Sequence, residues 1–100
     1  MLNEILTQNP NDILARYGLA VEYSNHGKTE QALDEFKKLL TSNPDYAAGY
    51  FMAAQTLARA SRNQEARKML AEGIAAAKRS GNAHAQSEME GMLEELGNAL

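Results

Sequence analysis

The sequence contains one phrase twice, as ILTQNPND at residues 5–12 and as LLTSNPDY at residues 39–46. Both copies start with two apolar residues, both carry an Asn-Pro step, and the second follows the first after 34 residues. Asn is a favourable N-cap residue, and Pro is well tolerated at the first helical position because an N–H there has no partner within the helix. The phrase therefore predicts two helix starts, with Asn9 and Asn43 as the caps and Pro10 and Pro44 in the first turn.

The repetition extends beyond this phrase. A shift of 34 residues also aligns Tyr17 with Phe51 and Ala32 with Ala66. A period of this length, filled with residues that favour helices, is typical of stacked helical hairpins, in which each unit buries its apolar face only against its neighbours. We therefore expect residues 1–100 to form a single domain of antiparallel helix pairs.

Local signals divide the chain into helices. We expect a short helix over about 2–8, a hairpin over about 10–41, a second hairpin over about 44–79 and a last helix over about 82–96. Gly27 is expected to end the first long helix in a left-handed turn, and Thr29 and Asn63 are expected to cap the second helix of each hairpin. Because Lys78 stands where a third Asn-Pro step would have its proline, the second hairpin is predicted to continue about one turn further, to Gly81.

The two hairpins share a set of residues at matching positions. The first copy carries Arg16, Leu19, Ala20, Tyr23, Ala32, Phe36 and Pro44, and the second carries Tyr50, Ala53, Ala54, Leu57, Ala66, Leu70 and Lys78. This pattern resembles the tetratricopeptide repeat family, whose signature is W-x2-L-G-x2-Y, then A-x3-F, then P. The first copy departs from the signature where Arg16 replaces the aromatic residue and where Ala20 replaces the glycine.

The resemblance implies an all-α, right-handed α-solenoid with two repeats, an N-terminal remnant of a second helix and a C-terminal capping helix. It also implies a concave groove, lined by the first helices, in which such proteins bind peptide segments or helices of other proteins. We therefore predict a non-enzymatic adaptor that binds a peptide or an amphipathic segment. The groove residues would be Leu14, Tyr17, Val21, Ala48, Phe51, Met52, Gln55, Arg59, His84 and Ser87, followed by Gly91.

Two alternatives remain open for this surface. Aromatic residues at helical spacing, such as Tyr17 and Phe51, fit core packing as well as partner binding. The groove can also serve for self-association, so a homodimer stays as the alternative function. Residues 59–79 carry a net charge of +4 and residues 80–100 a net charge of −4, and these charges would either join two copies or lie on solvated faces of one chain.

Composition argues against several other classes of function. The sequence has no cysteine, which excludes disulfides and thiolate chemistry and fits the cytoplasm. The net charge is −3 and the basic segment lacks aromatic residues, so we expect no nucleic-acid partner. No apolar run reaches the roughly 20 residues that cross a bilayer, and the first residues show no secretory signal, so a membrane role is not expected either.

No residue pattern predicts catalysis, a cofactor or a metal. His26 and His84 fall in different units without cysteine nearby, which makes a zinc site improbable. The sequence GKT at residues 27–29 lacks the earlier glycine of a phosphate-binding loop. Glu90 and Glu94 lie four residues apart, a spacing that suits a solvated cap better than an acid–base pair in a shielded cleft.

Overall fold

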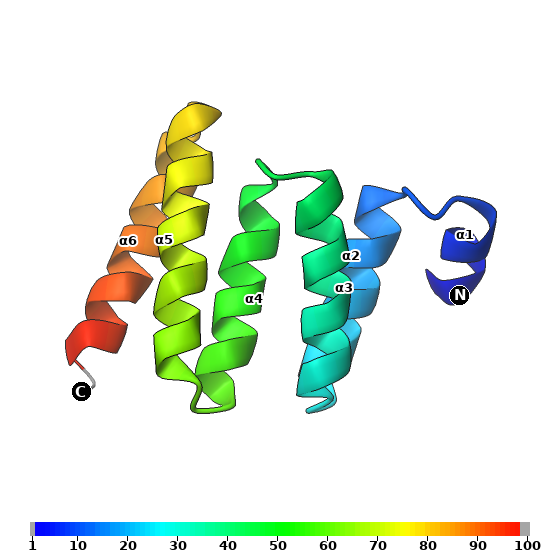
Figure 1. Cartoon of the computed structure of the whole chain (residues 1–100), viewed down its shortest axis with the longest axis horizontal. Coiled ribbons are helices and arrows are strands. Elements are labelled where there is room, and N and C mark those ends of the chain that lie inside the picture. The colour runs from blue at the N-terminus through cyan, green and yellow to red at the C-terminus, as the bar shows by residue number, and fades with distance from the viewer. Residues whose placement is uncertain (1, 99–100) are drawn as a thin grey trace. The chain divides into compact units, whose positions relative to one another are not determined.

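The computed structural model describes residues 2–98, and all regular secondary structure in this range is helical (Figure 1). The chain divides into two compact units, unit 1 (Met1–Pro44) and unit 2 (Asp45–Leu100), which are described separately below. The helices in chain order are α1 (Leu2–Gln8), α2 (Ile13–Asn25), α3 (Thr29–Ser42), α4 (Ala47–Arg59), α5 (Asn63–Arg79) and α6 (Ala83–Asn98).

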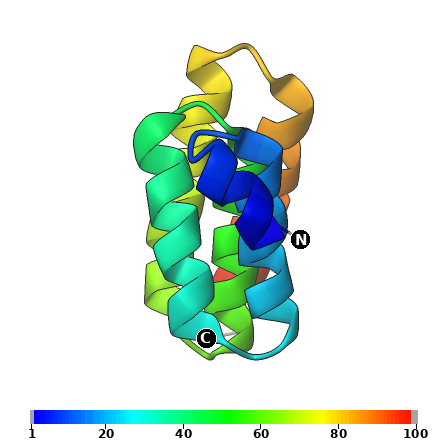
Figure 2. The ribbon, with the colours of Figure 1, turned by 90° about the vertical axis from the view of Figure 1, so that its right-hand side faces the viewer.

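Unit 1 is a helical hairpin with one short additional helix. α2 packs against α3 to form the hairpin, and α1 packs against α2, as Figure 2 shows from the side of α1. Ala20 on α2 and Ala32 on α3 have no exposed surface, and Phe36 is 1% exposed. Small side chains at these positions let two helices approach closely, so that the larger ring of Phe36 can fill the space beside the contact.

Unit 2 contains three helices around one core. α5 packs against both α4 and α6, and α4 and α6 also touch. Most of its buried side chains are small, and the largest that are fully buried are Leu70 and Met89. The buried apolar residues of this unit are Ala47, Tyr50, Ala53, Ala54, Leu57, Ala66, Leu70, Ala76, Ala77 and Met89.

The turns that follow α2, α4 and α5 share one backbone geometry. Gly27 and Gly81 have φ values of 72° and 70°, which confirms the left-handed turn predicted at Gly27, and Ser61 adopts the same region at 62°. After each of these residues, a backbone N–H donates to the carbonyl five positions earlier. These bonds are Lys28 to Tyr23 at 2.9 Å, Arg62 to Leu57 at 2.9 Å and Asn82 to Ala77 at 2.8 Å.

The predicted helix starts at Pro10 and Pro44 were wrong, because α2 and α4 each begin three residues later. The Asp12 N–H donates to the Asn9 carbonyl at 3.1 Å, which makes Asn9–Asp12 a β-turn with proline at its favoured second position. Asp12 then caps α2, since its carboxylate accepts the Ala15 N–H at 2.9 Å. The Asn-Pro step thus forms a turn before the helix.

The second Asn-Pro step also differs from its expected role. Asn43 ends α3, since both its backbone N–H and its side-chain Nδ2 donate to the Leu39 carbonyl, at 2.9 and 3.1 Å. Its side chain therefore satisfies a carbonyl at the end of one helix, where an N-cap would satisfy an N–H of the next helix. Asn43 is the C-cap of α3.

The caps expected at Thr29 and Asn63 were displaced by one residue. Each is the first residue of its helix, and the residues before them make no side-chain capping bond. Asn82 does act as a cap, because its Oδ1 accepts the Ala85 N–H at 3.1 Å. α5 has 17 residues against 14 in α3, in keeping with the extra turn expected from the missing proline.

The three helices of unit 2 meet at Gly73. A Cβ atom built on this residue would lie 2.5 Å from the Met89 sulfur and 2.6 Å from the Tyr50 Cβ. Both distances are far below van der Waals contact, so α5 lies closer to α4 and α6 at this point than any side chain larger than hydrogen allows. Glycine at this position fixes the spacing of the three helices.

Gly73→Ala should therefore destabilise the protein by about 1–3 kcal/mol, the usual cost of overpacking a core. Gly91→Ala is the matched control, because a Cβ at Gly91 meets nothing within 4 Å. Alanine there should stabilise α6 by up to about 1 kcal/mol through helix propensity. Urea unfolding followed by circular dichroism measures both changes, and equal effects of the two substitutions would contradict the close approach at Gly73.

Candidate functional site

In unit 1, the residues predicted to face a groove lie along one side of α2. Leu14 is 74% exposed, and Tyr17 and Val21 are half-buried. Among the described residues, two large apolar side chains are exposed, Leu14 on α2 and Ile5 on α1. Ile5 has the smaller exposed fraction, 39%. α2 thus presents an apolar strip to solvent, although its opposite face already contributes to a core.

Tyr17 contributes to both of these faces. Its ring lies edge-on against the ring of Phe36, with the centroids 6.4 Å apart and the planes at 69°. Such edge-to-face pairs stabilise by about 0.5–1.5 kcal/mol beyond the burial of their surface. Core packing and surface exposure, which were alternatives for Tyr17 in the sequence, are combined in one half-buried side chain.

In unit 2, the corresponding residues lie along α4. Ala48 and Arg59 are exposed, and Phe51, Met52 and Gln55 are half-buried. Phe51, Gln55 and Arg59 are spaced four residues apart, and this spacing places them in one row on the helix surface. The other side of α4 is buried at Ala47, Gly49, Tyr50, Ala53, Ala54, Thr56 and Leu57.

The predicted residues of α6 lie on its exposed side. His84, Ser87 and Gly91 are all exposed, and the His84 Nε2 lies 3.4 Å from a carboxylate oxygen of Glu88. α6 buries Met89 and half-buries several neighbours, while its glutamates point to solvent. This single apolar stripe with a polar outer side is the pattern of a capping helix.

Several basic side chains of residues 59–79 are engaged within unit 2. Arg62 pairs with Glu65 at 2.8 Å, and Arg67 donates to the Leu96 carbonyl at 3.1 Å, near the end of α6. The latter bond satisfies a carbonyl in the last turn of a helix, where positive charge is favourable. Less positive charge is therefore available for a second copy of the chain than the sequence alone suggests.

Arg59 differs from these residues because it lies against a neutral group. Its guanidinium donates to the Oε1 atom of Gln55 at 3.2 Å, one helical turn earlier. No ion pair among the described residues includes Arg59. The accessible side of α4 thus begins with apolar groups and ends with a positive charge held along the helix.

Arg79 links the end of α5 to the start of α4. Its Nη2 and Nε atoms donate to Asp45 at 2.7 and 3.0 Å, and its guanidinium also hydrogen-bonds the Tyr50 side chain. Burial raises the pKa of the Tyr50 hydroxyl, and the Arg79 charge opposes this rise without cancelling it. Arg79 is the last residue of α5, so the greater length of this helix brings Arg79 to these partners. The contacts fix the position of Asp45, which lies just before α4.

The raised pKa of Tyr50 predicts a loss of stability at alkaline pH. A tyrosine in the unfolded chain releases its proton near pH 10, whereas folded Tyr50 holds its proton to higher pH. The unfolding free energy should therefore fall as the pH rises above about 10. Urea midpoints between about pH 8 and pH 11 measure this loss, which should be smaller in Tyr50→Phe; an identical loss in both proteins would contradict the assignment.

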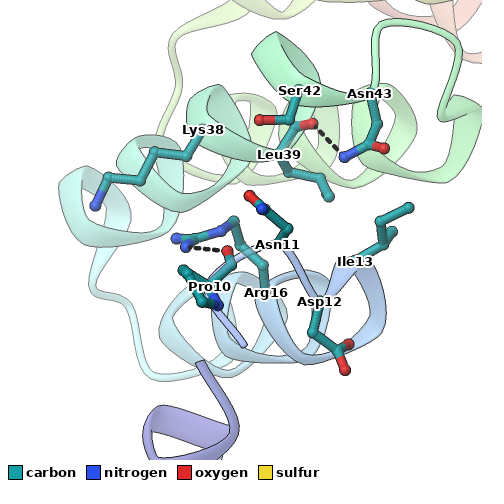
Figure 3. Close-up of a pocket in the computed structure, with 9 residues that line it drawn as sticks. All are labelled: Pro10, Asn11, Asp12, Ile13, Arg16, Lys38, Leu39, Ser42 and Asn43. Carbon is teal, nitrogen blue, oxygen red and sulfur yellow. Dashed lines mark hydrogen bonds between the residues drawn. The ribbon is translucent and has the colours of Figure 1, made fainter. Parts of the chain in front are cut away.

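A small pocket in unit 1 lies between the turn before α2 and the end of α3 (Figure 3). Its empty volume is about 190 Å³, a figure that includes open solvent, so the space enclosed by the protein is smaller than this. The lining residues are Pro10, Asn11, Asp12, Ile13, Arg16, Lys38, Leu39, Ser42 and Asn43.

Arg16 has a structural role in this pocket. Its Nη2 atom donates to the Pro10 carbonyl at 2.9 Å, and its Nη1 atom pairs with the Glu35 carboxylate of α3. Arg16 stands where the repeat signature has an aromatic residue, and these bonds tie α2 to α3 and to the preceding turn. No buried side-chain nitrogen or oxygen in the described part of the chain lacks a hydrogen-bond partner.

Residues 2–98 contain no group of three or more His, Cys, Asp or Glu side chains placed to hold a metal ion. None of the helices described is both long enough and apolar enough to span a membrane.

The profile of the tetratricopeptide repeat family matches residues 25–87. This match covers more than half of the chain, and the chain therefore belongs to the tetratricopeptide repeat family. Such repeats commonly act as protein–protein interaction modules. The fold is an all-α solenoid of helical hairpins, as predicted from the 34-residue period.

Individual relatives agree with this membership. The chain is 28% identical over 98 residues to a TPR repeat-containing protein of Pseudomonas aeruginosa, covering 98% of this chain and 93% of that protein. It is 30% identical to the solution structure of a tetratricopeptide repeat domain protein from Salinibacter ruber, with a TM-score of 0.81, covering 88% of this chain and 89% of that one. The solution structure of a protein from Bordetella parapertussis is 26% identical, with a TM-score of 0.85, covering 98% and 85% of the two chains.

Proposed function

We propose that this protein is a non-catalytic adaptor that binds an apolar or amphipathic segment of another protein. The surfaces involved are the accessible side of α2 in unit 1 and the accessible sides of α4 and α6 in unit 2. The observation that carries this proposal is the 74% exposure of Leu14 beside half-buried Tyr17 and Val21. Family membership supports it, because tetratricopeptide repeats commonly bind other proteins.

The energetic basis of the proposal is the burial of these apolar groups by a partner. Burying a leucine or phenylalanine side chain fully contributes about 1.5–3 kcal/mol, and Leu14 has most of this surface still to bury. A few such anchors, surrounded by polar groups, commonly dominate the binding of a peptide or helix. The proposal assigns no catalytic residue, cofactor or metal, since repeat proteins of this family are generally scaffolds, and it places the protein in the cytoplasm.

Leu14→Ser and Phe51→Ser should each weaken the capture of a partner by about tenfold or more, equivalent to about 1.4 kcal/mol. Capture is measured by cross-linking the purified chain to proteins of its source cell and quantifying one reproducible partner. Ile5→Ser is the matched control, because it replaces an exposed apolar residue of α1 outside the proposed surface. Tyr17→Ala is less suitable, since the contact between Tyr17 and Phe36 would also be lost.

Each variant is first checked for a wild-type urea midpoint, so that reduced capture reports on the surface. A double variant, Leu14→Ser with Phe51→Ser, that captures the partner as well as the wild type does would contradict the proposal. Loss of capture in Ile5→Ser alone would move the site to α1.

Self-association is the second candidate function, because the same apolar strip on α2 could meet its copy across a twofold axis. Light scattering after size exclusion distinguishes the two functions. An adaptor should be monomeric across a hundredfold range of concentration. A stable dimer that Leu14→Ser dissociates would replace the adaptor proposal with the homo-oligomer.

A further inference from the structure

We propose that the segment bound by unit 2 carries a single side-chain carboxylate that pairs with Arg59, in addition to an apolar anchor that contacts Phe51. This inference rests on the proposed function, because it specifies the chemistry of the partner for the same face of α4. The carboxylate is that of an aspartate or glutamate within the segment.

The first support is the state of the arginines. Three of them pair with carboxylates, Arg16 with Glu35, Arg62 with Glu65 and Arg79 with Asp45. Arg67 is half-buried and donates to the Leu96 carbonyl. Arg59 is exposed, and its described contact is with the neutral side chain of Gln55, so its charge has no carboxylate partner among residues 2–98.

The second support is the way in which Arg59 is held. Gln55 lies one turn before it and accepts a hydrogen bond from its Nη2 atom at 3.2 Å. In this arrangement the guanidinium lies on the same row of α4 as Phe51, with its other N–H groups available. Arginine and carboxylate pair through parallel hydrogen bonds of defined geometry, so an oriented guanidinium specifies its ligand better than a mobile one does.

The spacing of these residues defines the ligand further. Phe51 and Arg59 are eight residues apart, which corresponds to about 12 Å along a helix at 1.5 Å per residue. A helical partner lying along α4 would therefore have its acidic residue about eight positions from its apolar anchor. An extended partner would have it about four positions away, at about 3.3 Å per residue.

The charge of α6 favours a ligand with one carboxylate over a ligand with several. α6 belongs to the same unit and touches α4, and its described part carries exposed glutamates and no lysine or arginine. A run of acidic residues on the partner would meet this like charge, whereas one carboxylate opposite Arg59 would not. The exposed glutamates of α6 are Glu88, Glu90, Glu94 and Glu95.

Selection from a displayed library of random 16-residue peptides tests this inference directly. The full chain, Arg59→Gln and Phe51→Ser serve as parallel targets. Wild-type selections should enrich peptides with an apolar residue and one acidic residue at the spacings given above. Arg59→Gln should abolish the acidic preference and keep the apolar one, and Phe51→Ser should reduce enrichment as a whole.

A double-mutant cycle then measures the pair itself. The peptide most enriched by the wild-type protein is synthesised with an amidated C-terminus. A second version of this peptide has its acidic residue replaced by the corresponding amide, asparagine or glutamine. Either the peptide change or Arg59→Gln should weaken binding about tenfold, as expected for a hydrogen bond to a charged group, and the two changes together should add little more. Lys68→Gln is the matched control, because it removes one positive charge from an exposed position on α5. Binding should be unchanged in this variant.

The outcomes separate this inference from the proposed function. Apolar peptides whose enrichment depends on Phe51 and is indifferent to Arg59 would overturn the acidic preference and leave the adaptor proposal in place. Binding that is lost when the peptide C-terminus is amidated would assign the charge to a terminal carboxylate and overturn the side-chain assignment. A wild-type selection that enriches no peptide at all would overturn both proposals.

Discussion

The structure depends on the close approach of helices over small side chains. Ala20 and Ala32 in unit 1, and Ala54 and Ala66 in unit 2, have no exposed surface. At Gly73 the helices approach even more closely, because there is no space for a Cβ atom at this position. When backbones approach this closely, the first helix of each hairpin needs only a narrow stripe of residues to fill the core. The remaining sides of α2 and α4 can therefore carry Leu14 or Phe51 without loss of packing.

Much of this arrangement could be predicted from the sequence, and the helix starts show where prediction failed. The 34-residue period and the conserved spacing of small and large residues between the two copies define which helices pair. The Asn-Pro step was misinterpreted because asparagine and proline favour a β-turn as strongly as a helix start. Asp12 accepts the Ala15 N–H in place of Asn9, and Ser61 adopts positive φ with no glycine to signal it.

For the candidate site, the sequence predicted which residues share a helix face but not which groups they meet. Periodicity alone placed Phe51 and Arg59 together on α4. The contact of Tyr17 with Phe36 and the bonds of Arg79 to Asp45 join different helices, and their residues are separated by 19 and 34 positions, so no local pattern shows them. The sequence also could not show that Arg59 has no carboxylate partner among the described residues, because this depends on which carboxylates the other arginines contact.

The three matching turns have a consequence for how the repeats end. Gly27 and Ser61 join the two helices of a hairpin, whereas Gly81 joins α5 to α6, a place where an Asn-Pro junction would otherwise link two repeats. The chain has replaced the junction with a hairpin turn at this position. α5 is therefore shared by two successive hairpins, as the second helix of one and the first helix of the next, and unit 2 is a three-helix bundle built with the parts of a two-helix repeat.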